Sequence, residues 1–307
     1  MTQADLVTGA FSYSGSHIAR QLLDAGRHVR TLTFHPDREH PLQGDVEALA
    51  YRFDDPVALT RSLGDVSTLY NTYWVRFDRG QATFANALEH SRMLFFAAKR
   101  AGVQRIVHVS ITNPCIGSPL PYFRGKALVE LALAQTGTPY SIIRPTWLFG
   151  GQRDVLVNNI AWILRRIPVF ATPGTGSYPV QPVHVDDLAR ICIQAATADD
   201  DLVVDAAGPE RMPFRELVGL VRAAVGSHGP VIPLPPVVMT AAARALGRLV
   251  GDVVLTADEI TGLMAGLLVS ADPPRGQIAF SHWLDQHTTS IGRAYANELD
   301  RHFGPRP

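Results

Sequence analysis

Tyr122 and Lys126 are the two side chains of this chain whose types and spacing best suit acid–base chemistry. They lie in the segment Tyr122-Phe123-Arg124-Gly125-Lys126, which opens a helical pattern of apolar residues. Because four residues make about one helical turn, the tyrosine and the lysine share one face of that helix. A lysine ammonium beside a phenol lowers the pKa of the phenol, which can then exchange a proton with a carbonyl or an alcohol.

A strand–turn–helix segment at the start of the chain is typical of a dinucleotide-phosphate site. The apolar run that begins at Leu6 leads into a turn and then into an amphipathic pattern. In such a turn the first glycine allows the sharp bend and the last lets the helix pack on the strand, and the helix N-terminus faces a pyrophosphate. Ser12 replaces the middle glycine, so a tight turn without a ligand is the alternative. The predicted phosphate-binding residues are Gly9, Ala10, Phe11, Ser12, Tyr13, Ser14 and Gly15.

Two longer motifs specify a family. One is Arg144-Pro145-Thr146 within residues 140–150, and the other is Val183-His184-Val185-Asp186-Asp187 within residues 182–190. With the tyrosine–lysine pair and the glycine turn, they make the chain resemble an atypical or extended short-chain dehydrogenase/reductase. It is similar to the NmrA-like and complex I accessory-subunit-like NAD(P)H-binding proteins, from Leu6 to about Val221.

This resemblance implies roles for individual residues. Tyr122 would protonate the substrate oxygen, and Lys126 would hold the nicotinamide ribose and lower the pKa of the tyrosine. The third catalytic position, a Ser or Thr after the fifth strand, would be Ser110 or Thr112, with Thr112 in the better register. Further cofactor contacts are expected from Asn71, Thr72 and Tyr73 after the fourth strand and from the backbone of Pro145 and Thr146.

The residues after the second strand favour NADP(H) over NAD(H). No acid closes that strand to accept ribose hydroxyls and repel a 2′-phosphate, whereas His35 and Arg38, following Phe34, could reach a phosphate. After the third strand, Asp54 or Asp55 could hold the adenine amino group. Asp55-Pro56 is equally suited to begin a helix as N-cap and first residue.

Aromatic residues follow two of the predicted strands at the edge where ligands bind. Tyr73 and Trp74 follow the fourth strand, and Trp147 and Phe149 follow the sixth. We expect them to line a substrate pocket that prefers an aromatic or polycyclic ketone to a charged sugar nucleotide. Ordinary core packing is the alternative, since aromatic residues fill cores as readily as pockets.

The order of predicted elements defines an α/β fold with a doubly wound parallel sheet of the Rossmann type and a small C-terminal substrate lobe. Strands are expected at residues 5–8, 28–33, 47–51, 68–71, 105–109 and 140–144, with helices between most of them. One long helix is expected over 81–101, with Phe84, Leu88, Phe95 and Phe96 in the core. Residues 1–149 would form the dinucleotide-binding core, with 180–207 returning to it. Residues 150–179 and 208–307 would form the substrate lobe.

Composition excludes several other classes of protein. Lys+Arg and Asp+Glu both number 28 in 307 residues, which gives no electrostatic reason to expect nucleic acid or a membrane as partner. The two cysteines cannot form a disulfide framework, and no metal site is expected. His184 suits a structural role, and Asp186 and Asp187 would cap a helix that begins at Leu188. With no secretion signal, the chain is expected to be cytoplasmic, with a small-molecule substrate and a homodimer as a further possibility.

The function these features favour is that of an NADP(H)-dependent oxidoreductase, which reduces a carbonyl or enone or oxidises an alcohol on a small, largely apolar substrate. Two alternatives stay open. One is a nucleotide-sugar epimerase or dehydratase that uses NAD, although the substrate lobe has no evident arginine and lysine cluster for a diphosphate. The other is a non-catalytic NAD(P)H-binding regulator or assembly factor, which the retained Tyr122 and Lys126 disfavour.

Overall fold

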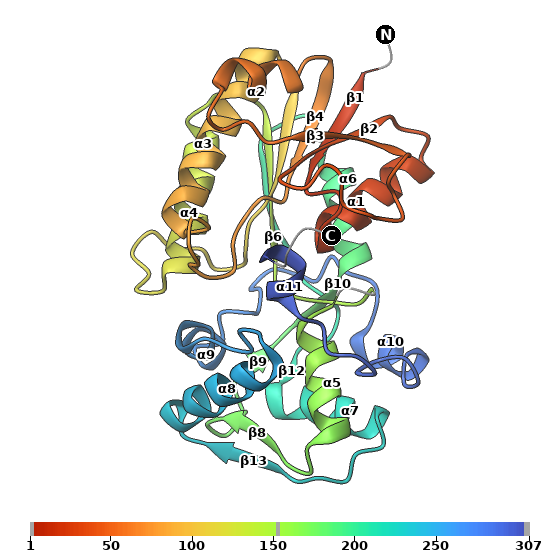
Figure 1. Cartoon of the computed structure of the whole chain (residues 1–307), viewed down its shortest axis with the longest axis vertical. Helices are drawn as coiled ribbons and strands as arrows, with labels where there is room; N and C mark the ends of the chain where they lie inside the picture. Colours follow the sequence, from red (N-terminus) through yellow and green to blue (C-terminus); the bar gives the residue numbers. More distant parts are fainter. Residues whose placement is uncertain (1–2, 152–153, 304–307) are drawn as a thin grey trace. The chain divides into compact units, whose positions relative to one another are not determined.

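The computed structural model describes residues 3–151 and 154–303, which form two compact units (Figure 1). The first, called the sheet unit below, comprises Met1–Pro145 and Val185–Ala206. The second unit comprises Thr146–His184 and Ala207–Pro307. Residues 146–149 and 180–184, which the sequence assigns to the dinucleotide-binding core, lie in the second unit because the strands they contain pair with each other.

The sheet unit is built on seven parallel strands, which confirms the predicted doubly wound fold. Their spatial order is β11-β6-β5-β4-β1-β2-β3, so the order reverses beside β1, where folds of this type bind dinucleotides. The strands inside the sheet are buried runs of mostly apolar residues, as expected for a sheet covered on both faces, whereas the edge strands β3 and β11 are partly exposed. Their bounds are β1 Ala4–Thr8, β2 Val29–Thr33, β3 Val46–Ala50, β4 Val66–Asn71, β5 Arg105–Val109, β6 Tyr140–Pro145 and β11 Leu202–Ala206.

Helices cover both faces of this sheet (Figure 1). On one face lie α1 (Tyr13–Asp24) and α6 (Val185–Ala195), and on the other lie α2 (Pro56–Ser62), α3 (Phe84–Ala101) and α4 (Pro121–Ala134). A hydrophobic core joins the second set of helices to the sheet. Its fully buried members include Leu59, Leu94, Phe95, Ile106 and Leu133.

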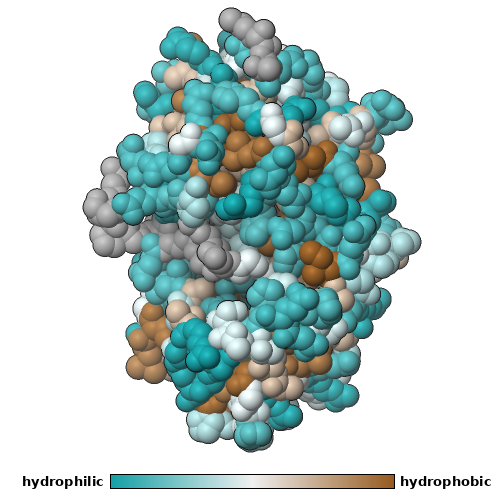
Figure 2. Space-filling model, turned by 90° about the vertical axis from the view of Figure 1, so that its right-hand side faces the viewer, coloured by the Kyte–Doolittle hydropathy of each residue, from teal (hydrophilic) through white to brown (hydrophobic). Residues whose placement is uncertain are grey.

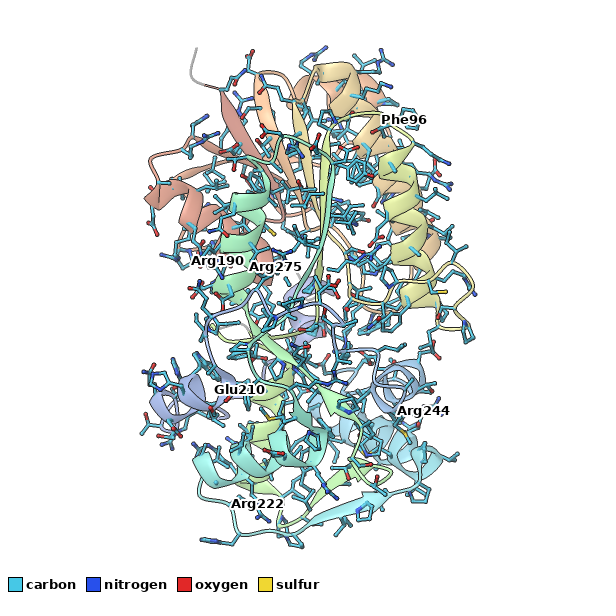
Figure 3. All side chains as sticks on the ribbon, turned by 180° about the vertical axis from the view of Figure 1, so that it is seen from behind. Phe96, Arg190, Glu210, Arg222, Arg244 and Arg275 are labelled. Carbon is cyan, nitrogen blue, oxygen red and sulfur yellow. The ribbon has the colours of Figure 1, made fainter. Side chains whose placement is uncertain are left out.

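Helix α3 begins at Phe84, three residues later than predicted. The Thr83 hydroxyl accepts a hydrogen bond from the backbone N–H of Asn86, and this N-cap fixes the start of the helix. The expectation that both Phe95 and Phe96 are core residues is wrong for Phe96, which is 59% exposed on the outer side of α3 (Figure 3). Successive helical residues point about 100° apart, so only Phe95 faces the sheet.

Helix α6, in contrast, begins earlier than predicted. It starts at Val185, directly after β10, instead of at Leu188. Asp186 and Asp187 therefore lie in its first turn, where their negative charge suits the helix dipole, and not before it. The Asp186 carboxylate is 2.5 Å from His17 Nδ1, and that of Asp187 is 2.8 Å from Arg190 (labelled in Figure 3). The two aspartates serve the architecture of the sheet unit.

The second unit combines three two-stranded sheets with helices around its own hydrophobic core. The strand pairs are β7 (Trp147–Phe149) with β10 (Pro182–His184), β8 (Phe170–Pro173) with β13 (Val231–Leu234), and β9 (Pro179–Val180) with β12 (Met212–Pro213). The helices are α5 Leu156–Arg166, α7 Phe214–Ala224, α8 Pro236–Val250, α9 Ala257–Met264, α10 Phe280–Gln286 and α11 Glu298–Phe303.

Hydrophilic residues dominate the face of the molecule drawn in Figure 2, and apolar residues form small separate groups on it. Within residues 3–151 and 154–303, none of the helices combines the length and the apolar character that crossing a bilayer requires.

The contact between Gly15 and the turn before it predicts a sharp difference between two glycine substitutions. A Cβ on Gly15 would lie 2.2 Å from the Gly9 carbonyl oxygen, whereas a Cβ on Gly219 in α7 would meet nothing within 4 Å. We expect Gly15→Ala to lower the free energy of unfolding by about 1–3 kcal/mol, since the helix must move away from the strand.

Gly219→Ala is the matched control, because alanine favours a helix interior over glycine by about 0.5–1 kcal/mol. Urea denaturation of both variants measures the difference. Equal stability of Gly15→Ala and the wild type would show that α1 does not depend on the close approach to β1.

Candidate functional site

The turn between β1 and α1 has the geometry of a phosphate-binding turn. Gly9 has a φ of 66°, in the left-handed region that favours glycine, and Gly15 packs on its carbonyl. The Ser12 hydroxyl donates a 2.6 Å hydrogen bond to that carbonyl, so it does not cap the helix. The first turn of α1 carries no acidic residue and no side-chain cap, which leaves its N-terminus suited to an anion.

The remaining residues of this turn contribute backbone more than side chain. Ala10 and Phe11 are buried, and the Phe11 ring lies 5.0 Å from that of His40. The Ala10 N–H donates to Thr31 on β2. Tyr13 and Ser14 are half-buried in the first turn of α1. A phosphate at this turn would therefore contact backbone N–H groups and the exposed parts of Tyr13 and Ser14.

An aromatic cluster lies beyond the carboxyl ends of β2, β3 and β4. It consists of Phe34, Tyr51, Phe53, Tyr73 and His90, with His90 stacked 4.0 Å from Phe53. The Tyr73 hydroxyl lies 2.9 Å from His90 Nδ1, and burial raises the pKa of Tyr73 to about 12. Tyr73 is therefore a phenol at neutral pH. Phe34 is 51% exposed, so one ring of the cluster faces solvent.

Charged residues flank this aromatic cluster. His35 and Arg38 are half-buried in the turn after β2, where the Arg38 N–H bonds to the His35 carbonyl. The two readings of the acidic pair after β3 are now separable. Asp55 caps α2, accepting hydrogen bonds from Val57 and Ala58, whereas Asp54 is exposed and lies 3.6 Å from Arg52.

Strand ends at β1 and β4 are tied together by hydroxyl groups. The Thr72 N–H donates to the Thr8 hydroxyl at 2.7 Å, and the Thr72 hydroxyl donates to the Thr8 carbonyl at 2.6 Å. Asn71 is fully buried and takes part in the same network through its side-chain amide. Of the three residues predicted after β4, Asn71 and Thr72 thus hold strands together, and Tyr73 joins the aromatic cluster.

Trp74 brings Tyr122 and Lys126 into one site on α4. Its ring lies over Gly125, where a Cβ would be 2.8 Å from the indole, so only glycine leaves room for it. The ring meets Tyr122 edge-on at 6.2 Å, and Lys126 Nζ lies 5.1 Å from its centre, within range of a cation–π interaction. Tyr122 is half-buried at the start of α4, next to Pro121.

Lys126 is buried, with 3% of its surface exposed, and its ammonium donates a 2.9 Å hydrogen bond to the Val109 carbonyl at the end of β5. Burial lowers the pKa of Lys126 to about 7, against the opposing effect of the Glu130 carboxylate. Arg144 pairs with Glu130 at 2.6 Å and so shares that charge. The ammonium is therefore close to its titration point at neutral pH.

The two candidate hydroxyl groups after β5 differ in their surroundings. Thr112 is buried and donates to the Asp205 carboxylate at 3.1 Å. Ser110 Oγ is also buried, and no hydrogen-bond partner for it occurs in the part of the chain that the structure describes. Ser110 directly follows Val109, so it adjoins the carbonyl that Lys126 contacts.

Trp147 and Phe149 are core residues of the second unit. Phe149 is fully buried with edge-on contacts to Phe280 and Trp283, and Trp147, 6% exposed, stacks on Phe214. Both rings therefore match the packing alternative that the sequence left open. His184 has the expected structural position, with its ring 5.1 Å from that of Phe149.

The residues after β6 are divided between the units. Pro145 ends the strand in the sheet unit, and its carbonyl accepts from the Thr112 N–H. Thr146 begins the second unit and donates its hydroxyl to the Gln181 carbonyl.

Two positions that shape the candidate site have no distinctive signal in the sequence. Gly125 lies within the Tyr122–Lys126 segment, but the reason for a glycine there is the indole of Trp74, which is far away in sequence and leaves no room for a side chain. His108 lies on β5 opposite Asn71 of β4, fully buried, in a strand that otherwise reads as apolar core. Its polar character is a signal, though not a distinctive one, because any histidine in the middle of a buried parallel strand needs a partner.

Comparisons with known proteins agree with this geometry. Residues 9–159 match a family described as NAD(P)H-binding. The chain is 24% identical over 285 residues to a mitochondrial protein of Arabidopsis thaliana, NADH dehydrogenase [ubiquinone] 1 alpha subcomplex subunit 9, covering 86% of this chain and 70% of that one. It is 28% identical over 268 residues to an uncharacterised protein of Sinorhizobium fredii, covering 79% and 66%.

Among solved structures, the triphenylmethane reductase of Citrobacter sp. complexed with NADP(H) superposes with a TM-score of 0.75 at 16% identity, covering 93% of this chain and 99% of that one. At this identity the likeness shows the fold. Over residues 9–159 the chain is therefore similar to NAD(P)H-binding proteins, and its fold is that of the reductase.

The buried ammonium of Lys126 predicts a pH-dependent cost to stability. The pKa of this lysine falls from its ordinary 10.5 to about 7 on folding, so between these pH values the unfolded chain binds more protons and stability rises with pH. Below pH 7 the folded protein carries the full cost of burying the charge. We expect Lys126→Met to raise the free energy of unfolding by about 1–3 kcal/mol at pH 6, with a gain that shrinks toward pH 10.

Urea denaturation at pH 6 and pH 9.5 measures this effect. The chain has two lysines, and Lys99→Met, which changes the exposed one, is the control. A Lys126→Met variant that is less stable than the wild type at pH 6 would mean that the Val109 hydrogen bond outweighs the cost of burial.

Proposed function

We propose that the protein is an NADP(H)-dependent oxidoreductase that reduces a carbonyl or enone, or oxidises an alcohol, on a small and largely apolar substrate. The observation that carries the proposal is the contact of Trp74, from the β4–α3 connection, with Tyr122 and Lys126 of α4 beside the end of β5. A structural tyrosine at a helix start would need neither a buried lysine one turn later nor an indole against both.

The residues present fit a dinucleotide. The close approach of Gly15 to Gly9 and the uncapped first turn of α1 suit a pyrophosphate. No carboxylate closes β2, and His35 and Arg38 follow it, which supports NADP(H) over NAD(H). Asp37 in the same turn is exposed, so it can turn toward solvent.

Each member of the site has a distinct task in this proposal. A bound nicotinamide would supply or accept a hydride. Tyr122 delivers the proton to the substrate oxygen, and the Lys126 ammonium lowers the pKa of the phenol through its positive charge. Ser110 is the better candidate for a hydrogen bond to the substrate oxygen, because the Thr112 hydroxyl is engaged by Asp205.

The substrate class follows from Trp74 and the aromatic cluster. The sequence offers four aromatic residues for a pocket wall. Trp147 and Phe149 lie in the core of the second unit, which leaves Tyr73 and Trp74 for that wall. Both are half-buried on the β4–α3 connection. Flat apolar walls suit a ring-containing ketone and offer nothing to a sugar diphosphate.

Two observations favour a second candidate function, that of a non-catalytic NAD(P)H-binding protein. Lys126 donates to a backbone carbonyl, which is an architectural contact, and the similar plant protein is named as a subunit of an NADH dehydrogenase. In that case Tyr122 and Lys126 would serve packing, and the chain would bind the dinucleotide without turnover.

Cofactor preference gives the first test. Replacing Arg38 with Ala should weaken NADPH binding about tenfold and leave NADH binding nearly unchanged, because a guanidinium–phosphate contact is charge-assisted. Arg61→Ala, which removes an exposed arginine of α2, is the control for net charge. Titration calorimetry with both cofactors measures the ratio, and equal wild-type affinities for NADPH and NADH would contradict the preference.

The role of Tyr122 gives the second test. Tyr122→Phe should reduce turnover by about a hundredfold to ten-thousandfold while leaving cofactor affinity and stability close to wild type, since the ring contacts remain. The assay follows NADPH absorbance with a panel of aromatic and polycyclic ketones. Phe123→Tyr, beside it on the buried side, controls for general disturbance of α4. Wild-type turnover in Tyr122→Phe would assign the tyrosine to packing.

If the wild type binds NADPH but turns over none of the ketones, the non-catalytic candidate gains instead.

A further inference from the structure

Buried side chains of β1, β4 and β5 form a hydrogen-bonded chain, and its hydrogen-bond directions can be deduced. The Thr8 hydroxyl accepts from the backbone N–H groups of Thr72 at 2.7 Å and Tyr73 at 3.1 Å, so its own proton is donated. Asn71 Oδ1 lies 3.1 Å away to accept it. The Tyr73 N–H, which can only donate, also lies 3.2 Å from Asn71 Oδ1. The oxygen of the Asn71 amide is thereby fixed as the acceptor. Its nitrogen must therefore be the atom that faces the next member of the chain.

That next member is His108, which lies opposite Asn71 in the β4–β5 register. Asn71 Nδ2 is 3.1 Å from His108 Nδ1, and since an amide nitrogen only donates, Nδ1 accepts. The proton of the neutral imidazole is then on Nε2. Burial and the nearby Lys126 charge keep the pKa of His108 well below its ordinary value, so the ring is neutral.

Three buried donors face one region of the sheet unit. His108 Nε2 and Ser110 Oγ have no hydrogen-bond partner among residues 3–151 and 154–303, and Lys126 Nζ bonds to the Val109 carbonyl between them. Alternate residues of a strand share a face, so His108 and Ser110 point to the same side of β5 as Ile106, the side covered by α3 and α4. His108 packs edge-on against Phe95 of α3, in agreement.

Buried donors without an acceptor are costly, and an ordered water that accepts from two or three such groups relieves the cost. We propose that His108 Nε2–H and Ser110 Oγ hold one buried water against the Lys126 ammonium, which makes His108 a positioning residue for Lys126. The water oxygen would accept hydrogen bonds from His108 Nε2–H and from the Lys126 ammonium. One hydrogen of the water would be donated to Ser110 Oγ.

The role of this water is to keep Lys126 charged. Without it, the ammonium has the Val109 carbonyl and the Trp74 ring as its uncharged partners. The other ionisable groups around Lys126 are Tyr122 and Glu130 on α4, and Arg144 on β6, which pairs with Glu130. Of these, the Glu130 carboxylate raises the pKa of Lys126. The consequence for turnover rests on the proposed function, since a neutral lysine would no longer lower the pKa of Tyr122.

Lysine NMR tests the proposal without cofactor or substrate. Because the chain has two lysines, Lys99 and Lys126, labelling with [13Cε]lysine gives two signals, which Lys99→Arg assigns. The Lys126 signal is titrated in the wild type, His108→Leu and His108→Gln. Glutamine can accept from Asn71 with its oxygen and donate to the water with its nitrogen, so it is the conservative variant.

We expect His108→Leu to lower the pKa of Lys126 by about one unit or more, and His108→Gln to keep it within about 0.3 unit of the wild type. Ser110→Ala, a smaller change that keeps the core apolar contacts, should lower it as well, which secures the test if His108→Leu does not fold. The Lys99 signal is the internal control. In an active protein, the alkaline limb of the NADPH-dependent rate should move to lower pH by the same shift in His108→Leu.

An unchanged or raised pKa of Lys126 in both His108→Leu and Ser110→Ala would overturn the proposal. A shift that occurs only with NADPH bound would also overturn it, because the acceptor would then be a cofactor oxygen. If the shifts appear in the free protein but no NADPH binding or turnover is found, the water site stands and the proposed function falls.

Discussion

The burial of one ammonium group is the constraint on which the candidate site depends. Lys126 lies 3% exposed under an indole ring, with its charge directed at the carbonyl of Val109. An isolated buried charge is so costly that a protein keeps it only where hydrogen bonds and nearby dipoles compensate. Gly125 permits that arrangement, because its missing side chain lets Trp74 lie flat on α4 and close the site from the side of the β4–α3 connection.

The glycine turn also depends on a missing side chain. Gly15 lets α1 approach the carbonyl of Gly9, so the helix N-terminus is aimed across the strand ends. Thr8, the last residue of β1, holds the start of the β4–α3 connection through both its hydroxyl and its carbonyl. The β4–α3 connection, which carries Trp74, is therefore hydrogen-bonded to β1, which leads into the glycine turn. These hydrogen bonds link the glycine turn to the segment that contacts Tyr122 and Lys126.

Most of the sheet could be predicted from sequence because the strands inside it are buried, mostly apolar runs bounded by turns, and this pattern is local. The errors came where a residue's environment is set by tertiary contacts. Phe95 and Phe96 read alike, yet one helical step separates core from solvent. Trp147 and Phe149 follow a predicted strand, which suits a pocket wall as well as a core. The pairing of β7 with β10, which places them in the second unit, is visible only in the structure. The turn and the tyrosine–lysine segment were readable because their chemistry depends on short spacing.

His108 illustrates what sequence could not supply. Its partner Asn71 is on another strand, and only the register of β4 against β5 places the two side by side. The tautomer of the ring depends on the orientation of the Asn71 amide, which in turn depends on the backbone N–H of Tyr73. His108 is thus the last member of a hydrogen-bonded chain in which each group donates to the next. Because Nδ1 accepts from Asn71, the proton of the neutral ring lies on Nε2, on the side away from Asn71.

A buried lysine with a pKa near neutrality is a costly feature for a fold to keep. An apolar residue of similar size would pack in the same volume without the cost of desolvation. The hydrogen bond to Val109 offsets part of that cost, and a structural role alone would be met by any uncharged donor. A buried amine one turn from a half-buried tyrosine, with its pKa brought near neutrality by burial, is the arrangement on which the proposed function rests.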